Sequence, residues 1–236
     1  MNIKNVSIPC SGYSLVADWY ENKTSDKVLL TFLGYSSSKA RNRDFLMALS
    51  DKTGMNVLAV DLSGHGESPF ELDKTRPGQH LLEAIETFDW LRHERPNAKI
   101  TVLGTSYRGF LAAYLTRYRN FDKLILRTPA IYLPSDLYSF QDGIDRNYTS
   151  NVFRKDKHAV SSHPLFKQIS VFNGSTLLII HELDEDVPIQ TTDIYKESFS
   201  ADVYIASGFK HSMKDMSNPV EGLVYYQDTI VNWLLK

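Results

Sequence analysis

Residues 99–115, KITVLGTSYRGFLAAYL, contain the transition that decides the fold. The stretch opens with an apolar run of strand length, and apolar residues then recur at helical spacing from Leu111 to Leu115. Ser106 lies where the expected strand becomes the expected helix. A serine on such a sharp turn has an exposed hydroxyl and needs a small residue two positions earlier, which is Gly104. We therefore expect a strand, a tight turn at Ser106 and a helix.

The same alternation continues along the chain. Residues 2–9 and 14–21 alternate polar and apolar side chains, which predicts two outer strands. Apolar runs typical of buried parallel strands follow at 27–34, 56–63, 99–106, 123–129, 176–184 and 202–207. Helical spacing is found over 81–91, over 111–115 and, after a Ser217-Asn218-Pro219 start, over 220–234. This order predicts an α/β fold, with a mostly parallel twisted sheet of about eight strands and helices on both faces.

The composition is that of a globular domain. Of the 236 residues, 42% are hydrophobic, which is enough to bury a full core, so we expect a single domain over residues 1–236. There are 26 Lys and Arg against 28 Asp and Glu, with no long block of one sign, so nothing in the charge favours a nucleic-acid partner. No amphipathic helix points to binding at a membrane.

Cysteine usage and the lengths of the apolar runs bear on location. Cys10 is the only cysteine, which excludes an intrachain disulfide and fits a reducing compartment. The longest apolar runs fall far short of the roughly 20 residues that span a bilayer. The start, MNIKNVSIPC, lacks an apolar stretch of signal-peptide length. A cytoplasmic protein without a membrane anchor is therefore expected.

One connection is longer than the others. Residues 131–175 separate two predicted strands by about 45 residues of mixed aromatic and charged character, more than an ordinary connection requires. An excursion of this kind is usually a lid or a binding element, so we expect a small cap insertion over 131–175. The alternative is a surface insertion that makes no contact with substrate.

Two residues that follow later predicted strands are candidates to activate Ser106 as a nucleophile. Asp184 lies at the end of the run 176–184, and His211 follows the run 202–207. Serine is a poor nucleophile, so a histidine must take its proton and an acid must hold the imidazole in one tautomer. Because parallel strands present their carboxyl ends at one edge of the sheet, we expect all three side chains there as a catalytic triad.

These residues and two further motifs resemble the α/β-hydrolase family, specifically its small serine-esterase-like members with a short cap insertion. Residues 61–68, DLSGHGES, resemble the family's D-x-x-G-H-G-x-S loop, and residues 184–188, DEDVP, match its D-x-x-V-P stretch. The resemblance implies that Asp184 is the catalytic acid and that His65 is structural. Asp186 is the substitute candidate, because the family's H-G-x-x-D sequence is one residue shorter here and lacks its glycine.

Two backbone N–H groups are expected to stabilise the negative charge that acyl transfer places on a carbonyl oxygen. The first belongs to Tyr107, directly after the nucleophile. By resemblance, the second belongs to Tyr35 in the segment 32–35, FLGY, which corresponds to the family's H-G-x segment. Leu33 stands where the family often has histidine, which removes a loop-bracing hydrogen bond but leaves the backbone donor.

Arg108 occupies the position two after the serine, where the family usually has glycine. We expect its side chain to point outward and pair with an acid, because the start of a helix tolerates a long side chain that reaches solvent. The alternative is that Arg108 crowds the turn and displaces Ser106.

The resulting prediction is a serine hydrolase, a carboxylesterase or thioesterase that cleaves a small-to-medium acyl ester or thioester through a covalent acyl-enzyme. Tyr132, Tyr138 and Phe140 are expected to shape the substrate pocket, since such pockets commonly have aromatic walls. No cofactor and no metal site are expected. A peptidase or amidase with the same triad is one alternative. The other is an inactive binding module of the same fold, supported by Arg108, Leu33 and the short acid loop.

Overall fold

The computed structural model describes residues 2–35, 37–167, 172–212 and 219–236. Its centre is an eight-stranded sheet with the strand order β1-β2-β4-β3-β5-β6-β7-β8. The strands are β1 (Asn2–Cys10), β2 (Tyr13–Glu21), β3 (Lys27–Phe32), β4 (Asn56–Asp61), β5 (Lys99–Thr105), β6 (Lys123–Arg127), β7 (Ser175–His181) and β8 (Asp202–Ala206). Every strand that the sequence predicts is present.

The sheet is antiparallel at one edge and parallel elsewhere. β2 pairs antiparallel with both β1 and β4. The pairs β3–β4, β3–β5, β5–β6, β6–β7 and β7–β8 are all parallel. The predicted α/β fold with a mostly parallel sheet is confirmed, and the carboxyl ends of β3 and β5 to β8 therefore meet at one edge.

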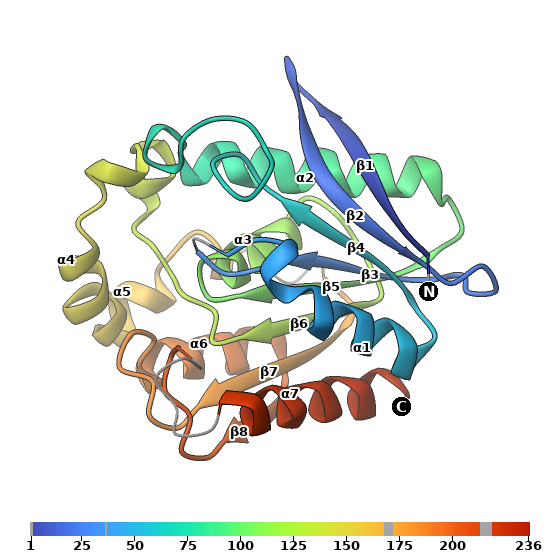
Figure 1. Ribbon diagram of the computed structural model, residues 1–236. Helices are drawn as coiled ribbons and strands as arrows, with labels where there is room; N and C mark the ends of the chain where they lie inside the picture. Colours follow the sequence, from blue (N-terminus) through green and yellow to red (C-terminus); the bar gives the residue numbers. More distant parts are fainter. Residues whose placement is uncertain (1, 36, 168–171, 213–218) are drawn as a thin grey trace.

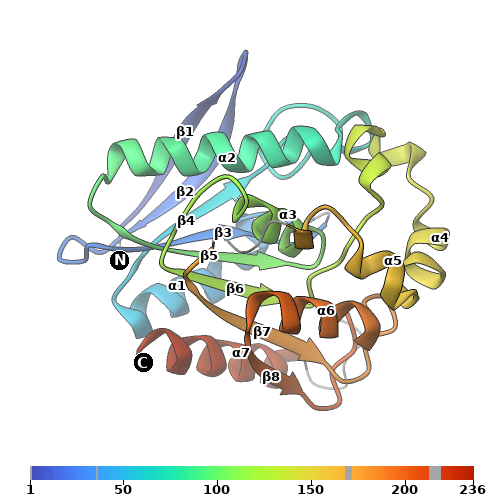
Figure 2. The same cartoon turned by 180° about the vertical axis from the view of Figure 1, so that it is seen from behind.

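Helices cover both faces of the sheet. α1 (Arg43–Thr53) and α7 (Pro219–Leu234) lie on the face toward the viewer in Figure 1. α2 (Pro77–Glu94), α3 (Tyr107–Leu115) and α6 (Ile189–Phe199) lie on the other face, seen in Figure 2. The sequence predicted α2, α3 and α7. None of the helices in the part of the chain that the structure describes has the length and apolar character needed to cross a bilayer.

Two helices that pack on the sheet, α1 and α6, were not predicted from the sequence. Only Leu46, Leu49 and Ser50 are buried in α1, and α6 buries Thr191 and Thr192 beside three apolar side chains. In α1, Phe45 and Met47 also pack against the core. Each helix has only 11 residues, so its apolar spacing repeats over only about three turns. Both helices owe their position to packing against the sheet.

Element boundaries differ slightly from the prediction. β6 stops just before Thr128, whose positive φ of 41° is incompatible with an extended strand. β7 ends at His181, three residues earlier than expected. α7 begins at Pro219, whereas Ser217 and Asn218, the rest of its predicted start, lie outside the described residues.

Each face of the sheet has its own apolar core, because successive strand residues point to opposite sides. On β5, Val102 belongs to the core shared with α2 and α3, and Leu103 to the core shared with α1 and α7. Phe110 of α3 and Tyr226 of α7 are large members of these two cores. The strands are thus fixed from both sides, which holds their carboxyl ends in place.

The connection between β6 and β7 lies beyond the carboxyl ends of these strands (Figure 1). Gln141 N donates to Thr75 O at 3.0 Å, and Thr191 Oγ1 donates to Arg154 O at 2.8 Å, which ties the connection to the body of the fold. Its short elements are η3 (Pro134–Tyr138), η4 (Gln141–Gly143), α4 (Arg146–Asn151), η5 (Phe153–Lys155) and α5 (Lys157–Ser161). Residues 168–171 of the predicted insertion lie outside the described residues.

Four histidines are buried within the fold: His65, His80, His163 and His181. Burial lowers the pKa of His163 to about 4 and the pKa values of His65 and His181 to about 3, and a nearby arginine adds to each shift. Burial also lowers the pKa of His80 well below its ordinary value. All four are therefore neutral in the folded protein near neutral pH.

We expect acid to destabilise the fold through these histidines. The unfolded chain takes up their protons near the ordinary histidine pKa of about 6.5, whereas the folded chain does so only at lower pH. Their contribution is thus complete above about pH 6.5 and falls below it by up to about 1.4 kcal/mol per pH unit for each histidine. Urea unfolding at several pH values measures this slope.

The variant His163→Phe isolates one of the four groups. The Phe side chain keeps the ring contacts with Phe110 and Tyr114 but does not titrate. Near pH 5 its unfolding free energy should change with pH by about 1.4 kcal/mol per unit less than in the parent protein. The same slope in both proteins would show that His163 is not buried in the neutral form.

Candidate active site

The turn between β5 and α3 holds Ser106 in an unusual backbone conformation, with φ 52° and ψ −121°. Such a conformation costs of order 1–3 kcal/mol for a residue other than glycine. The surrounding backbone holds it: Ser106 N donates to Arg127 O at 2.9 Å, and Ser106 O accepts from Phe110 N and Ala130 N. The expected sharp strand-to-helix turn is therefore present.

Two glycines allow this turn to form. A Cβ at Gly104 would lie 2.5 Å from Ala112 Cβ and 2.6 Å from Arg108 O, and a Cβ at Gly109 would lie 3.0 Å from Pro129 Cα. A side chain at Gly104 would therefore push α3 away from β5. Gly109 has the corresponding role toward the residues after β6.

The structure brings Ser106, His211 and Asp184 together from the ends of three strands. Ser106 Oγ lies 2.9 Å from Nε2 of His211, and Nδ1 of His211 lies 2.7 Å from Oδ2 of Asp184. The carboxylate accepts from Nδ1–H, so Nε2 of the neutral imidazole is left to accept the serine proton. The Asp184 side chain is 2% exposed and that of His211 is 23% exposed, so the aspartate lies behind a histidine that substrate can reach.

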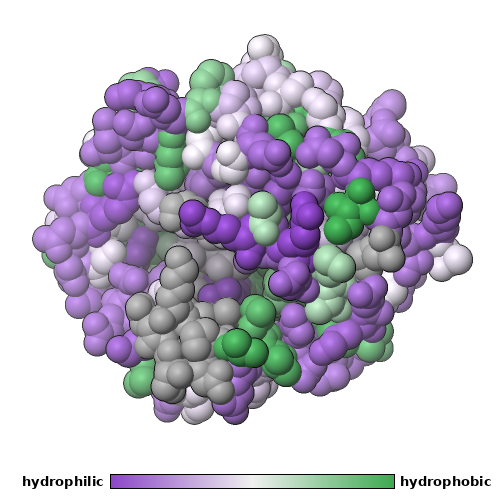
Figure 3. All heavy atoms as spheres, viewed as in Figure 1, coloured by the Kyte–Doolittle hydropathy of each residue, from purple (hydrophilic) through white to green (hydrophobic). Residues whose placement is uncertain are grey.

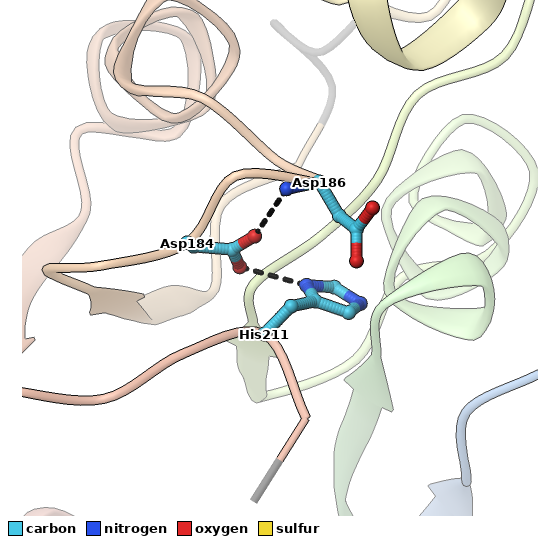
Figure 4. A group of neighbouring side chains, drawn as sticks. All are labelled: Asp184, Asp186 and His211. Atoms are coloured by element: carbon cyan, nitrogen blue, oxygen red, sulfur yellow. Dashed lines mark hydrogen bonds and ion pairs between the residues drawn. The ribbon is translucent and has the colours of Figure 1, made fainter. Parts of the chain in front are cut away.

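Asp186 lies beside this pair but makes a different contact (Figure 4). Oδ1 of Asp184 accepts from the backbone N–H of Asp186 at 2.9 Å and of Val187 at 2.8 Å. Ligand-type atoms of Asp184, Asp186 and His211 lie within 4.8 Å of one another, a spacing that would suit a cation. Both oxygens of Asp184 are, however, already used in hydrogen bonds that orient it toward His211.

The two expected oxyanion donors flank the serine. A Cβ built on Gly34 would lie 3.9 Å from Ser106 Cβ, so the loop that carries Tyr35 passes directly beside the nucleophile. The rings of Tyr35 and Tyr107 make an edge contact at 5.9 Å. Among the residues that the structure describes, neither backbone N–H has a hydrogen-bond acceptor. The oxyanion role of both stays a prediction.

A cavity of about 440 Å³ opens beside Ser106 and His211, between the sheet and the helices α1 and α7. Its described walls combine apolar side chains with two arginines and contain no acidic residue. The apolar and charged lining residues are Leu33, Phe45, Leu103, Leu223, Tyr226, Ile230, Arg41 and Arg127. The cavity therefore offers a serine nucleophile, apolar walls and positive charge.

Comparison with known sequences places this arrangement in a family. The serine aminopeptidase S33 family of hydrolases matches residues 23–164, more than half of the chain. The chain belongs to this family. The expectation of an α/β-hydrolase, and with it of a hydrolase, is confirmed. A search of curated proteins finds no match.

Solved structures show the same fold as this S33-family hydrolase. An esterase from Pyrococcus furiosus has 21% sequence identity and a TM-score of 0.69, covering 99% of this chain and 93% of that chain. Est1E from Butyrivibrio proteoclasticus, solved with ferulic acid, has 16% identity and a TM-score of 0.72, covering 98% of both chains. A monoacylglycerol lipase from Paleococcus ferrophilus has 16% identity and a TM-score of 0.68, covering 93% of this chain and 98% of that chain.

A hydrogen-bond network that the sequence analysis missed joins the two oxyanion candidates of the S33-family hydrolase. Arg146 Nη2 donates to Tyr35 Oη at 2.8 Å and to Gln141 Oε1 at 3.2 Å. Gln141 Nε2 donates to Tyr107 Oη at 3.0 Å, and Tyr107 Oη lies 2.7 Å from Nδ1 of His80. Arg146 and Gln141 come from the connection between β6 and β7, and no motif or spacing marks them in the sequence.

The three aromatic residues expected to shape the pocket lie elsewhere. Tyr132 is buried against Tyr107 and Phe110 on the α2 and α3 side of the sheet. Tyr138 is 81% exposed, and Phe140 stacks under the guanidinium of Arg76. None of these three residues is among the described residues that line the cavity. The sequence placed them in the right segment, but their direction depends on how that segment folds.

The expectation that Arg108 points outward is wrong. Its side chain is fully buried, and none of its three guanidinium nitrogens has a hydrogen-bond partner in the described part of the chain. The reason is that all nine residues of α3 are buried, so this helix has no solvent face. Burial lowers the pKa of Arg108 to about 10, and the nearby negative charges of Asp61 and Glu83 oppose this shift.

Removal of this buried charge should stabilise the protein. Arg108→Met keeps much of the side-chain volume and removes an unpaired ion, so we expect the free energy of unfolding to rise by about 1 kcal/mol or more. Asp61 keeps its hydrogen bonds from the backbone N–H groups of Lys39 and Glu67. Chemical denaturation measures the change.

The matched control is Arg119→Met, which removes an exposed ion pair with Asp89. It should lower stability by no more than about 1 kcal/mol. A loss of stability in Arg108→Met larger than in Arg119→Met would show that Arg108 is well compensated within the fold.

Proposed function

We propose that this S33-family chain hydrolyses small-to-medium carboxylic esters through a covalent acyl-enzyme on Ser106. The observation that carries the proposal is the hydrogen-bonded relay from Ser106 through His211 to Asp184 at the wall of the cavity. Ser106 Oγ attacks the ester carbonyl carbon while Nε2 of His211 takes the hydroxyl proton. Asp184 holds the Nδ1–H of His211 and stabilises the imidazolium that forms.

The imidazolium of His211 then gives its proton to the leaving alkoxy oxygen, and the C–O bond breaks. An acyl group remains on Ser106, and the alcohol departs. A water molecule replaces the alcohol, loses a proton to His211 and attacks the acyl carbon. Collapse of this second tetrahedral intermediate releases the acid and restores Ser106.

The N–H groups of Tyr35 and Tyr107 are assigned to the oxyanion in both steps. Their lack of described acceptors and the approach of Gly34 to Ser106 support this assignment. We also propose that residues 131–175 act as a cap. Arg146 and Gln141 of this segment hydrogen-bond the side chains of Tyr35 and Tyr107, so the cap would brace the loops that carry both donors.

Ester hydrolysis is preferred over aminopeptidase activity, although the family's description is serine aminopeptidase. An aminopeptidase must hold the positively charged amine of its substrate, which requires a nearby carboxylate. The described wall of the cavity has two arginines and no acidic residue, which supports an uncharged or anionic substrate. An inactive module is disfavoured because Arg108 and Leu33 leave the hydrogen bonds of the relay in place.

Labelling tests the nucleophile directly. A fluorophosphonate probe should phosphonylate Ser106 with loss of HF, which adds the probe mass less HF to the intact protein, and should abolish hydrolysis of nitrophenyl esters from acetate to dodecanoate. Ser106→Ala should show neither labelling nor turnover, because it removes the attacking oxygen. A folded parent protein that is neither labelled nor active would support the inactive binding module instead.

Substitution of the two aspartates tests which acid serves the relay. Asp184→Asn should lower kcat by about 10³- to 10⁴-fold with little change in KM, because the imidazole loses its favoured tautomer. Asp186→Asn is the matched control and should keep activity within a few-fold, since its described contact to Asp184 is made by the backbone N–H. A larger loss of kcat in Asp186→Asn than in Asp184→Asn would reverse the assignment.

A further inference from the structure

Arg127 is a charged residue in the cavity that the proposed mechanism does not use. It is the last residue of β6, and its carbonyl oxygen accepts the hydrogen bond from Ser106 N at 2.9 Å. Its side chain lines the same cavity as Ser106 and His211. Neighbouring strands lie about 4.8 Å apart, so the charge and the nucleophile start from adjacent backbone positions.

The guanidinium of Arg127 has no hydrogen-bonding partner in the described part of the protein. Its Nε atom is buried and unpaired. Asp184 is the acid whose charge acts on it, but both oxygens of Asp184 are occupied by His211 and by backbone N–H groups. The remaining contact is with the ring of Tyr226, whose centroid lies 4.4 Å from Cζ of Arg127.

An arginine in this position lowers the stability of the fold when no ligand is bound. Burial lowers the pKa of Arg127 to about 10, so the side chain remains charged at neutral pH. The Arg127 residue as a whole is half-buried, and its Nε is enclosed by protein atoms. A cation that is partly removed from water and makes no hydrogen bonds destabilises a fold. The cavity offers no acidic residue in its described wall to satisfy this charge.

We propose that Arg127 binds a carboxylate of the substrate, so that the preferred esters carry a second, anionic group a few carbon atoms from the scissile carbonyl. The inference rests on the proposed ester hydrolysis at Ser106. A guanidinium donates two parallel hydrogen bonds to a carboxylate, and the partner would supply the acceptors that the protein does not. The apolar walls would contact the methylene chain between the two functional groups.

The same chemistry arises from two kinds of ester, and matched pairs distinguish them. Monoethyl adipate carries the carboxylate on the acyl side, and ethyl adipamate is its uncharged amide of nearly the same shape. Acetoxybutyrate carries the carboxylate on the alcohol side, and acetoxybutyramide is its uncharged counterpart. In the pair whose carboxylate lies on the side that reaches Arg127, we expect kcat/KM of the carboxylate ester to exceed that of its amide by about 10- to 100-fold. Charge-assisted hydrogen bonds in a cavity give differences of this size.

Two variants assign the preference to Arg127. Arg127→Met should bring the carboxylate-to-amide ratio to about one or below, while kcat/KM for the uncharged ester stays within a few-fold. Arg127→Lys should keep part of the preference, because the charge remains and the planar pair of donors is lost. A merely structural role would instead lower both members of a pair equally.

The parent protein alone provides a test that does not depend on folding of the variants. Adipate should inhibit hydrolysis of a nitrophenyl ester competitively and at least about tenfold more strongly than adipamide. Equal kcat/KM within both pairs, or equal inhibition, would overturn the inference while leaving ester hydrolysis intact. A preference that survives in Arg127→Met would also overturn it. Absence of all ester hydrolysis and of Ser106 labelling would instead contradict the proposed function.

Discussion

The candidate site depends on one constrained residue, Ser106, which is held at positive φ between β5 and α3. Because Gly104 and Gly109 have no side chain, α3 can pack closely enough for Ser106 to adopt this conformation. Backbone hydrogen bonds with Arg127, the last residue of β6, and with Ala130, which follows that strand, then hold it. Because these bonds belong to a sheet that is buried on both faces, the hydroxyl has a defined position toward His211.

Two arginines near this turn differ from the usual placement of charged side chains. Arg108 is buried near Asp61 and Glu83, toward α2, and Arg127 is half-buried against Tyr226 of α7. Arg108 does not line the cavity beside Ser106, whereas Arg127 does. Both cations lack hydrogen bonds within the described residues. The fully buried one, Arg108, affects the stability of the fold, whereas the half-buried one, Arg127, suggests a substrate. The face that carries α1 and α7 is otherwise mostly hydrophilic, with scattered apolar side chains (Figure 3).

Much of the fold was predictable from local sequence. Alternation of polar and apolar residues marked β1 and β2, and apolar runs marked the other six strands. Central strands such as β4 and β5 are apolar at nearly every position because both of their faces are buried. α1 and α6 were missed because each has only 11 residues, over which helical spacing is a short pattern. Arg108 was misjudged because its exposure depends on the layers around α3. A helix covered on all sides is apolar all round, and Arg108 is the charged exception in α3.

The sequence by itself determined the family, the sheet and the three residue types of the proposed relay, because a turn motif, a strand order and two loop motifs are local patterns with local physical causes. Tertiary structure alone decided what surrounds them. Residues 35, 80, 107, 141 and 146 form one hydrogen-bond network, and Arg127 shares a cavity with Leu223 and Tyr226. These partners come from segments far apart in the chain. Their meeting depends on how helices and connections pack over the sheet, for which single-sequence periodicity carries no signal.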